Sequence, residues 1–140
     1  MQNLENYNLA IWGILVILTT VLIQSIVAMV VKASQPNAIP GKIDNSLSHE
    51  SFIFRAHRTL MNSLENITLM LGASIVAILI DASVLWTNLF IWTYAIARIL
   101  HMILYYAIST EKNPSPRSYF FLIGLTSNIG ILVLIAITLT

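Results

Sequence analysis

Long apolar segments constrain the fold of this 140-residue chain more than any other feature of its sequence. Crossing the hydrocarbon core of a membrane takes about 20 residues of helix. Residues 9–31 and 118–139 both exceed that length, and neither segment contains a charged side chain. Only 9% of all residues are charged, against roughly 25% in a typical soluble domain. The chain is therefore expected to lie in a membrane.

Two further segments can span a membrane under stated conditions. Residues 85–108 can span the membrane if Arg98 and His101 lie in polar surroundings. The apolar residues 67–80 are too short to span it unless their helix begins near Phe52. In lipid every backbone polar group must be bonded within the protein, which favours an all-α, four-helix antiparallel bundle. The spans are expected at about residues 8–32, 52–80, 85–108 and 117–139, in one integral membrane domain covering residues 1–140.

Basic residues mark one side of this predicted bundle. The expected connections are a loop at 33–48, a tight turn at 81–83 and a second loop at 109–117. The lysines and arginines that flank the spans lie in or beside the two loops, at positions 32, 42, 55, 58, 112 and 117. Cytoplasmic loops carry the excess of Lys and Arg in membrane proteins. Both termini are therefore expected outside or in the lumen, and both loops in the cytoplasm.

Polar side chains converge on one layer in the cytoplasmic half of the predicted bundle. Three on the second span follow an i, i+4, i+7 pattern, which is one helix face: Arg58, Asn62 and Glu65. Three on the third span follow an i, i+3, i+7 pattern: Arg98, His101 and Tyr105. An ionisable group inside a membrane costs roughly 2.5–3.5 kcal/mol on the insertion scale. The two faces are therefore expected to serve a function and to face each other or a neighbouring subunit.

Structural roles are the alternatives for these side chains. Arg55 and Arg58 could reach lipid phosphates at the interface. Glu65 could neutralise one of the arginines in an ion pair. His101 could be a core histidine with satisfied nitrogens, and Tyr105 could belong to an aromatic belt at the interface.

Composition excludes several functions. The net charge of +1 does not favour a nucleic-acid partner. The chain has no cysteine, and His49, Glu50 and His57 lack the HExxH spacing. No metal site is expected.

The polar side chains form a set of donors and acceptors that fits a small zwitterion. Arginines offer forked donors for carboxylates, a glutamate offers an anion for an ammonium group, and Asn62 can bond an amide. Glutathione carries two carboxylates, an amine, amides and a thiol. A nearby arginine would lower the pKa of that thiol, and the surrounding membrane would supply a lipophilic second substrate.

Three motifs resemble those of the MAPEG family, the membrane-associated proteins in eicosanoid and glutathione metabolism. The second span resembles its R-x-x-x-N-x-x-E-N pattern, with Arg58, Asn62, Glu65 and Asn66 in the key positions. The third resembles A-R-x-x-H-x-x-x-Y, as residues 97–105. The start of the fourth resembles the family's P-x-R-S opening, as "PSPRS" at 114–118, with Arg117 and Ser118. The resemblance covers nearly the whole chain.

The resemblance implies a homotrimer with glutathione between adjacent subunits, in the cytoplasmic half. It implies that the polar faces of the second and third spans hold the backbone of glutathione, with Arg58 as the ligand arginine. Arg117 would stabilise the thiolate with help from Ser118. Lys32 falls where some members have a basic residue that ends the first span, and Arg55 would be an anchor or an outer contact of the cofactor site.

The implied activity is that of a membrane glutathione transferase or peroxidase acting on a lipophilic electrophile or a lipid hydroperoxide. One departure bears on it, because Phe121 stands where family members often have an aromatic hydroxyl. Ser118 or Arg117 would then act without that hydroxyl, or Tyr119 would substitute from another helix face. Two other functions stay open. One is a glutathione-binding or lipid-binding protein without turnover, and the other is a small channel or transporter with a polar path.

Overall fold

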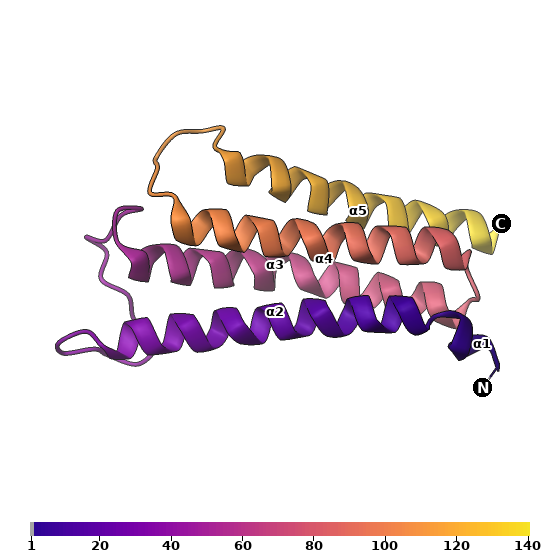
Figure 1. Ribbon diagram of the computed structural model, residues 1–140, viewed down its shortest axis with the longest axis horizontal. Coiled ribbons are helices and arrows are strands. Elements are labelled where there is room, and N and C mark those ends of the chain that lie inside the picture. The colour runs from indigo at the N-terminus through magenta and orange to yellow at the C-terminus, as the bar shows by residue number, and fades with distance from the viewer. Residues whose placement is uncertain (1) are drawn as a thin grey trace.

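The computed structural model describes residues 2–140 as an all-helical chain, with no strand among those residues. A short helix, α1 (Gln2–Asn6), precedes four long ones: α2 (Asn8–Ala33), α3 (Phe52–Leu79), α4 (Val84–Ala107) and α5 (Pro116–Leu139). The four long helices run antiparallel, side by side, in one elongated bundle (Figure 1). The expected four-helix fold is confirmed.

All four long helices have the length and apolar composition needed to cross a membrane. The 26 residues of α2 extend for about 39 Å, which exceeds a hydrocarbon core of about 30 Å. Helix α3 begins at Phe52, so its polar first half belongs to the same helix as the apolar residues 67–80. The polar stretch is therefore part of a spanning segment.

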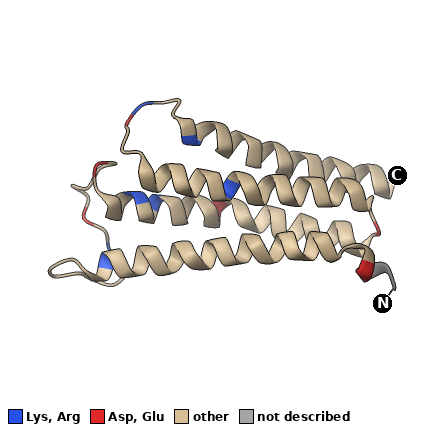
Figure 2. Ribbon diagram, viewed as in Figure 1, with Lys and Arg blue, Asp and Glu red and all other residues tan. Residues whose placement is uncertain are grey.

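The two ends of the bundle differ in their connections. Both termini and the short turn between α3 and α4 lie at one end, and the connections 34–51 and 108–115 lie at the other, called here the two-loop end (Figure 1). Lysine and arginine gather in the half of the bundle toward the two-loop end (Figure 2). This half is the one that the sequence predicts to contain the polar layer.

The interior of the bundle changes from apolar to polar along its length. In the half away from the loops, small and branched side chains form the core: Ala10, Ile17, Met70, Ala73, Ala77, Ile91, Tyr94, Ala95 and Ile131. Toward the two-loop end, fully or nearly fully buried polar side chains take their place: Gln24, Thr59, Ser63, Arg98 and His101. The half away from the loops also buries the neutral side chains of Ser74 and Thr87, so the two halves differ mainly in the buried Arg98 and His101 toward the two-loop end.

Several helix hydroxyls within the spans are bonded to their own helices. Thr20, Thr59 and Ser74 each donate to the carbonyl oxygen four residues earlier, at 2.8, 2.8 and 2.7 Å. A polar group in a membrane has no water to bond, so this local bond removes most of the cost of burying a hydroxyl. These hydroxyls therefore need no partner on another helix.

Two glycines of α5 differ in the space around them. A Cβ atom added to Gly130 would lie 2.7 Å from Cζ of Phe90, whereas one added to Gly124 would lie 3.6 Å from the ring of Tyr94, an ordinary contact. We expect Gly130→Ala to lower the free energy of unfolding by about 1–3 kcal/mol, because the ring of Phe90 must shift.

Gly124→Ala on the same helix is the matched control. Alanine is the better helix former, so this variant should be neutral or slightly stabilising. Thermal unfolding of both purified variants in the same detergent checks the pair. Equal effects of the two substitutions would contradict the packing of α5 against α4.

Candidate functional site

Arg98 joins the polar faces of α3 and α4 inside the bundle. Its side chain is only 4% exposed, and its Nη2 atom donates to Oδ1 of Asn62 at 2.8 Å and to Oγ of Ser63 at 3.0 Å. The two motif residues, Asn62 and Arg98, are therefore in direct contact, as the matched depth of the two faces predicts. The Nε atom of Arg98 is buried and has no partner among the described residues.

A cavity of about 420 Å³ opens beside this contact. Five of the predicted site residues line it: Asn62, His101, Tyr105, Arg117 and Ser118. Its volume falls within the range of about 300–1,000 Å³ that is typical of small-molecule sites. The remaining lining comes from Asn113, Pro114, Phe121 and Leu122, of which the sequence analysis singled out only Phe121.

Arg117 is held in place at the wall of this cavity. Its guanidinium carbon lies 4.0 Å from the centroid of the Tyr105 ring, in a cation–π arrangement. Its Nη2 atom donates to the carbonyl oxygen of Thr110 at 3.0 Å, and its Nη1 atom is buried without a partner among the described residues. The contact with the Tyr105 ring and the bond from Nη2 therefore hold the Arg117 guanidinium in place. Its Nη1 atom stays available to donate to a ligand.

Ser118 has a structural bond in addition to its place in the cavity. Its hydroxyl oxygen accepts a hydrogen bond from the backbone N–H of Ser115 at 3.2 Å, at the start of α5. The Oγ atom of Ser115 lies 3.3 Å away, and either hydroxyl can be the donor of that pair. The bond to the backbone uses a lone pair of Ser118, so its O–H can still donate to a ligand.

The buried His101 lies in the same cavity and is 3% exposed. Its Nδ1 atom has no partner among the described residues, so the alternative of a core histidine with both nitrogens satisfied is not supported. Nδ1 of His101 and Nη1 of Arg117 are two buried nitrogen atoms to which a zwitterionic ligand would hydrogen-bond. The cavity thus offers unpartnered polar atoms to a small polar ligand.

Arg58 and Glu65 do not face the cavity of their own chain. Both side chains are exposed on the outer surface of α3. The ion pair found among the described residues joins His49 to Glu111, so Glu65 pairs with neither Arg58 nor Arg98 within the chain. Of the two expected arrangements, Asn62 follows the first and faces α4. The exposed Arg58 and Glu65 do not face α4, and for them the second arrangement, a neighbouring subunit, stays a prediction.

Lys32 lies apart from the other predicted site residues. It lines a separate cavity of about 560 Å³ formed mostly by the connection after α2, together with Lys42, Asp44 and Ile53. This cavity is larger than the one beside Arg117, but it contains none of the α4 and α5 motif residues. Within one chain, Lys32 is therefore not near the polar pair of α3 and α4.

Arg55 holds the chain together at the two-loop end. Its Nη1 atom donates to the carbonyl oxygens of His49 at 2.6 Å and Glu50 at 2.8 Å, and its Nη2 atom donates to that of Tyr106 at 3.3 Å. These three bonds tie the segment before α3 to the end of α4. Arg55, predicted from the sequence to be an anchor or an outer contact, bonds backbone atoms within the chain.

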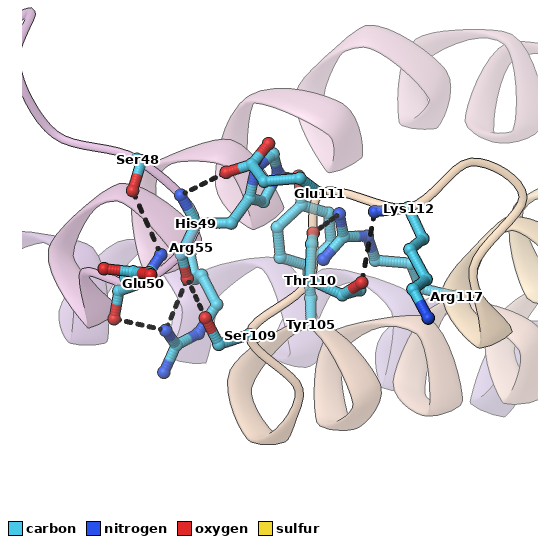
Figure 3. Close-up of polar contacts among 10 residues, drawn as sticks. All are labelled: Ser48, His49, Glu50, Arg55, Tyr105, Ser109, Thr110, Glu111, Lys112 and Arg117. Atoms are coloured by element: carbon cyan, nitrogen blue, oxygen red, sulfur yellow. Dashed lines mark hydrogen bonds and ion pairs between the residues drawn. The ribbon is translucent and has the colours of Figure 1, made fainter.

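No pattern in the sequence predicts the contacts of His49. Its imidazole lies 2.9 Å from a carboxylate oxygen of Glu111 and 3.0 Å from the hydroxyl of Tyr105 (Figure 3). Its carbonyl oxygen also accepts a hydrogen bond from the hydroxyl of Ser109 at 3.0 Å. His49 therefore connects the two loops to a residue of the cavity wall.

The bonds from His49 change the acidity of Glu111. The backbone N–H of His49 and then its imidazole hold the pKa of the Glu111 carboxyl below its ordinary value of 4.5. A carboxyl whose pKa is lowered by folding contributes stability above its ordinary pKa and loses it as the pH falls through the lowered value. We expect the NMR shift of the His49 amide proton to titrate with a midpoint below 4.5. A midpoint at or above that value would contradict the contact.

Four helices long and apolar enough to span a membrane, with a polar cavity near one end, are the features of an integral membrane protein. Comparison with known families is more specific. The model of the MAPEG family matches residues 9–137, nearly the whole chain, and the chain belongs to this family. No curated protein and no solved structure gives a significant match.

Proposed function

We propose that this protein is a membrane glutathione transferase or peroxidase that forms the glutathione thiolate beside Arg117. The observation that carries the proposal is the fixed guanidinium of Arg117, which lines a cavity with Asn62, His101 and Ser118 and keeps a buried nitrogen for a ligand. A fixed cation next to a thiol favours the charged thiolate and so lowers the thiol pKa. The hydroxyl of Ser118 would donate to the same sulfur.

The exposed charges of α3 support a second copy of the chain as part of the site. Arg58 and Glu65 lie on the outer surface of a spanning helix, and leaving each in lipid would cost roughly 2.5–3.5 kcal/mol. A neighbouring subunit that covers this face would remove the cost. We therefore infer a homotrimer, as the family resemblance implies, with glutathione between adjacent subunits. Arg58 would bond a carboxylate of glutathione and Glu65 its ammonium group.

The lipophilic substrate would enter from the bilayer. Phe121 and Leu122 line the cavity, and the side chain of Leu122 is 53% exposed on the membrane-facing surface of α5. An apolar molecule could therefore move from lipid toward Arg117 without crossing water. With both termini outside, the cavity and the loops would lie in the cytoplasmic half, where the basic residues gather.

The chemistry is a nucleophilic attack by the thiolate. With an electrophile, a sulfur–carbon bond forms and the leaving group departs with the bonding electrons. With a lipid hydroperoxide, the sulfur attacks the terminal oxygen and the oxygen–oxygen bond breaks, and a second glutathione then completes the formation of glutathione disulfide, an alcohol and water. In both cases Arg117 stabilises the thiolate electrostatically and stays chemically unchanged.

The experiment is turnover by the purified protein in lipid. Reduced glutathione is mixed with a chlorodinitrobenzene-type electrophile in one arm and with a lipid hydroperoxide in the other. Conjugation or peroxidase turnover above the uncatalysed rate would support the proposal. The absence of turnover in both arms, together with no glutathione binding, would overturn it.

A protein that binds glutathione or lipid without turnover is the second candidate. Phe121 favours it, because this apolar ring lines the cavity where a hydroxyl is often found in the family, and Tyr119 is 60% exposed and absent from the cavity lining. Binding without turnover in the same experiment would select this candidate. A channel is disfavoured because the lysines, arginines and His101 do not continue through the half away from the loops, where buried polar side chains such as Ser74 and Thr87 are neutral. Ion flux through liposomes would test it.

A further inference from the structure

His49 makes three close contacts that link the two loops to the cavity (Figure 3). Its Nδ1 atom lies 2.9 Å from Oε2 of Glu111, and its backbone N–H donates to Oε1 of the same carboxylate at 3.1 Å. Its Nε2 atom lies 3.0 Å from the hydroxyl oxygen of Tyr105. Each ring nitrogen of this histidine therefore has one defined partner, and one partner belongs to the cavity wall.

The carboxylate of Glu111 determines which nitrogen of His49 carries the proton. An ionised carboxylate only accepts hydrogen bonds, so Nδ1 must be the donor of that pair. In the neutral imidazole the other nitrogen, Nε2, then has no proton and accepts. The hydroxyl of Tyr105 must therefore donate its proton to His49, which leaves only its oxygen lone pairs for a ligand.

Protonation of His49 reverses this arrangement. When both ring nitrogens carry protons, Nε2 donates to the oxygen of Tyr105, and the hydroxyl proton of Tyr105 is released for another acceptor. The imidazolium also adds a positive charge close to the cavity. Both changes favour an anionic group of a ligand beside Tyr105.

We propose that His49 is a positioning residue that sets whether Tyr105 accepts or donates a hydrogen bond in the cavity, so that protonation of His49 tightens the binding of an anionic ligand group. This inference rests on the proposed glutathione site and adds a pH-dependent control of that site. His49 acts through Tyr105, and it also reaches Arg117 because the guanidinium rests on the Tyr105 ring.

Other charged and titratable groups around His49 are few and identifiable. From α3, Arg55 donates to its carbonyl oxygen at 2.6 Å, and the ring of Phe54 packs edge-on at 4.9 Å. From α4, the ring of His101 lies 5.4 Å from that of Tyr105. The remaining charged groups belong to the loops and the start of α5: Glu50, Glu111, Lys112 and Arg117. His101 is thus the other histidine whose protonation would reach Tyr105, and the test must separate the two.

The tautomer is tested first, without any ligand. NMR of histidine-labelled protein in nanodiscs should find neutral His49 protonated on Nδ1. In Glu111→Gln, the amide can keep the backbone contact with its oxygen and present its NH₂ to Nδ1, so the tautomer should move to Nε2–H. Finding Nε2–H in the wild type, or no change in the variant, would overturn the inference.

The effect on the site is tested with glutathione sulfonate, whose charge is constant between about pH 5.5 and about pH 8, where a histidine changes charge. We expect the affinity of the wild type for glutathione sulfonate to increase about fivefold toward the lower pH. A fivefold change corresponds to the net free energy of about one hydrogen bond. His49→Gln should remove this increase. His57→Gln, which changes a histidine of α3 outside the cavity lining, should retain it.

A combined variant separates the route through Tyr105 from the direct effect of charge. In Tyr105→Phe the ring stays under Arg117 but the hydroxyl is gone, so adding His49→Gln should change the pH dependence much less than it does in the wild type. An unchanged pH dependence in folded His49→Gln would overturn the inference and leave the proposed function intact. No binding of glutathione or its sulfonate by the wild type at any pH would overturn both.

Discussion

Replacing Arg117 with alanine is expected to lower kcat for glutathione conjugation on the order of a hundredfold to a thousandfold, the effect of removing one preorganised charge from a nucleophilic site. The guanidinium lines the cavity and is fixed by the Tyr105 ring and the carbonyl of Thr110. Without it, glutathione in the site would remain mostly the unreactive thiol. Steady-state kinetics of the purified variant measure the change directly.

Two control variants make this result specific. Arg117→Lys keeps a positive charge but loses the planar guanidinium, so its kcat should fall between those of the wild type and Arg117→Ala. Lys112→Ala removes an exposed basic residue of the neighbouring loop and should leave kcat unchanged. Thermal unfolding must show that all three variants remain folded. Wild-type kcat in folded Arg117→Ala would rule out a catalytic role for this arginine.

Arg58→Ala is expected to act mainly on glutathione binding, and Arg55→Ala mainly on stability. Arg58 has an exposed side chain on the spanning surface of α3, where it would meet glutathione and a second subunit, so its loss should weaken glutathione binding about tenfold or more. Arg55 makes three bonds to backbone carbonyls of the loop and of α4. Its loss should lower the thermal midpoint and weaken binding much less.

Calorimetric titration with glutathione and thermal unfolding, performed on both variants, measure the two effects. The pair also tests the register of the second-span motif, because the spacing to Asn62 and Glu65 selects Arg58 as the ligand arginine. A larger loss of affinity in Arg55→Ala than in Arg58→Ala would shift the register by one helical turn toward the loop.

The spans could be predicted because the bilayer leaves few alternatives. A segment in lipid must be helical and about 20 residues long, so residues 67–80 required the polar residues before them to complete a span. The structure places the start of that helix at Phe52, where the sequence analysis expects it. The helix ends follow from the positions of proline, glycine and polar residues in the connections.

The orientation of the α3 motif could be predicted only in part. At 3.6 residues per turn, Asn62 lies about 40° to one side of Arg58 and Glu65 about 20° to the other. A stripe of about 60° is wide enough to cross the border between the interior and the outer surface of a helix. Asn62 therefore bonds Arg98 inside the bundle, while the two charged residues lie outside it. Spacing identifies the stripe but not the position of this border.

The role of His49 could not be predicted from local sequence. Its partners Tyr105 and Glu111 are 56 and 62 residues away, and both contacts depend on how two irregular loops meet at one end of the bundle. No periodic pattern determines such a contact. The only local pattern involving His49 is the incomplete metal motif with Glu50, which gives no indication of Tyr105.

The most direct test of the central claim is the ultraviolet absorbance of the glutathione thiolate, recorded when the purified protein in nanodiscs is mixed with reduced glutathione near neutral pH. We predict a thiolate band that saturates with glutathione concentration in the wild type and is lost in Arg117→Ala. A wild-type protein that gives no thiolate band at any glutathione concentration would contradict the claim that this cavity activates glutathione.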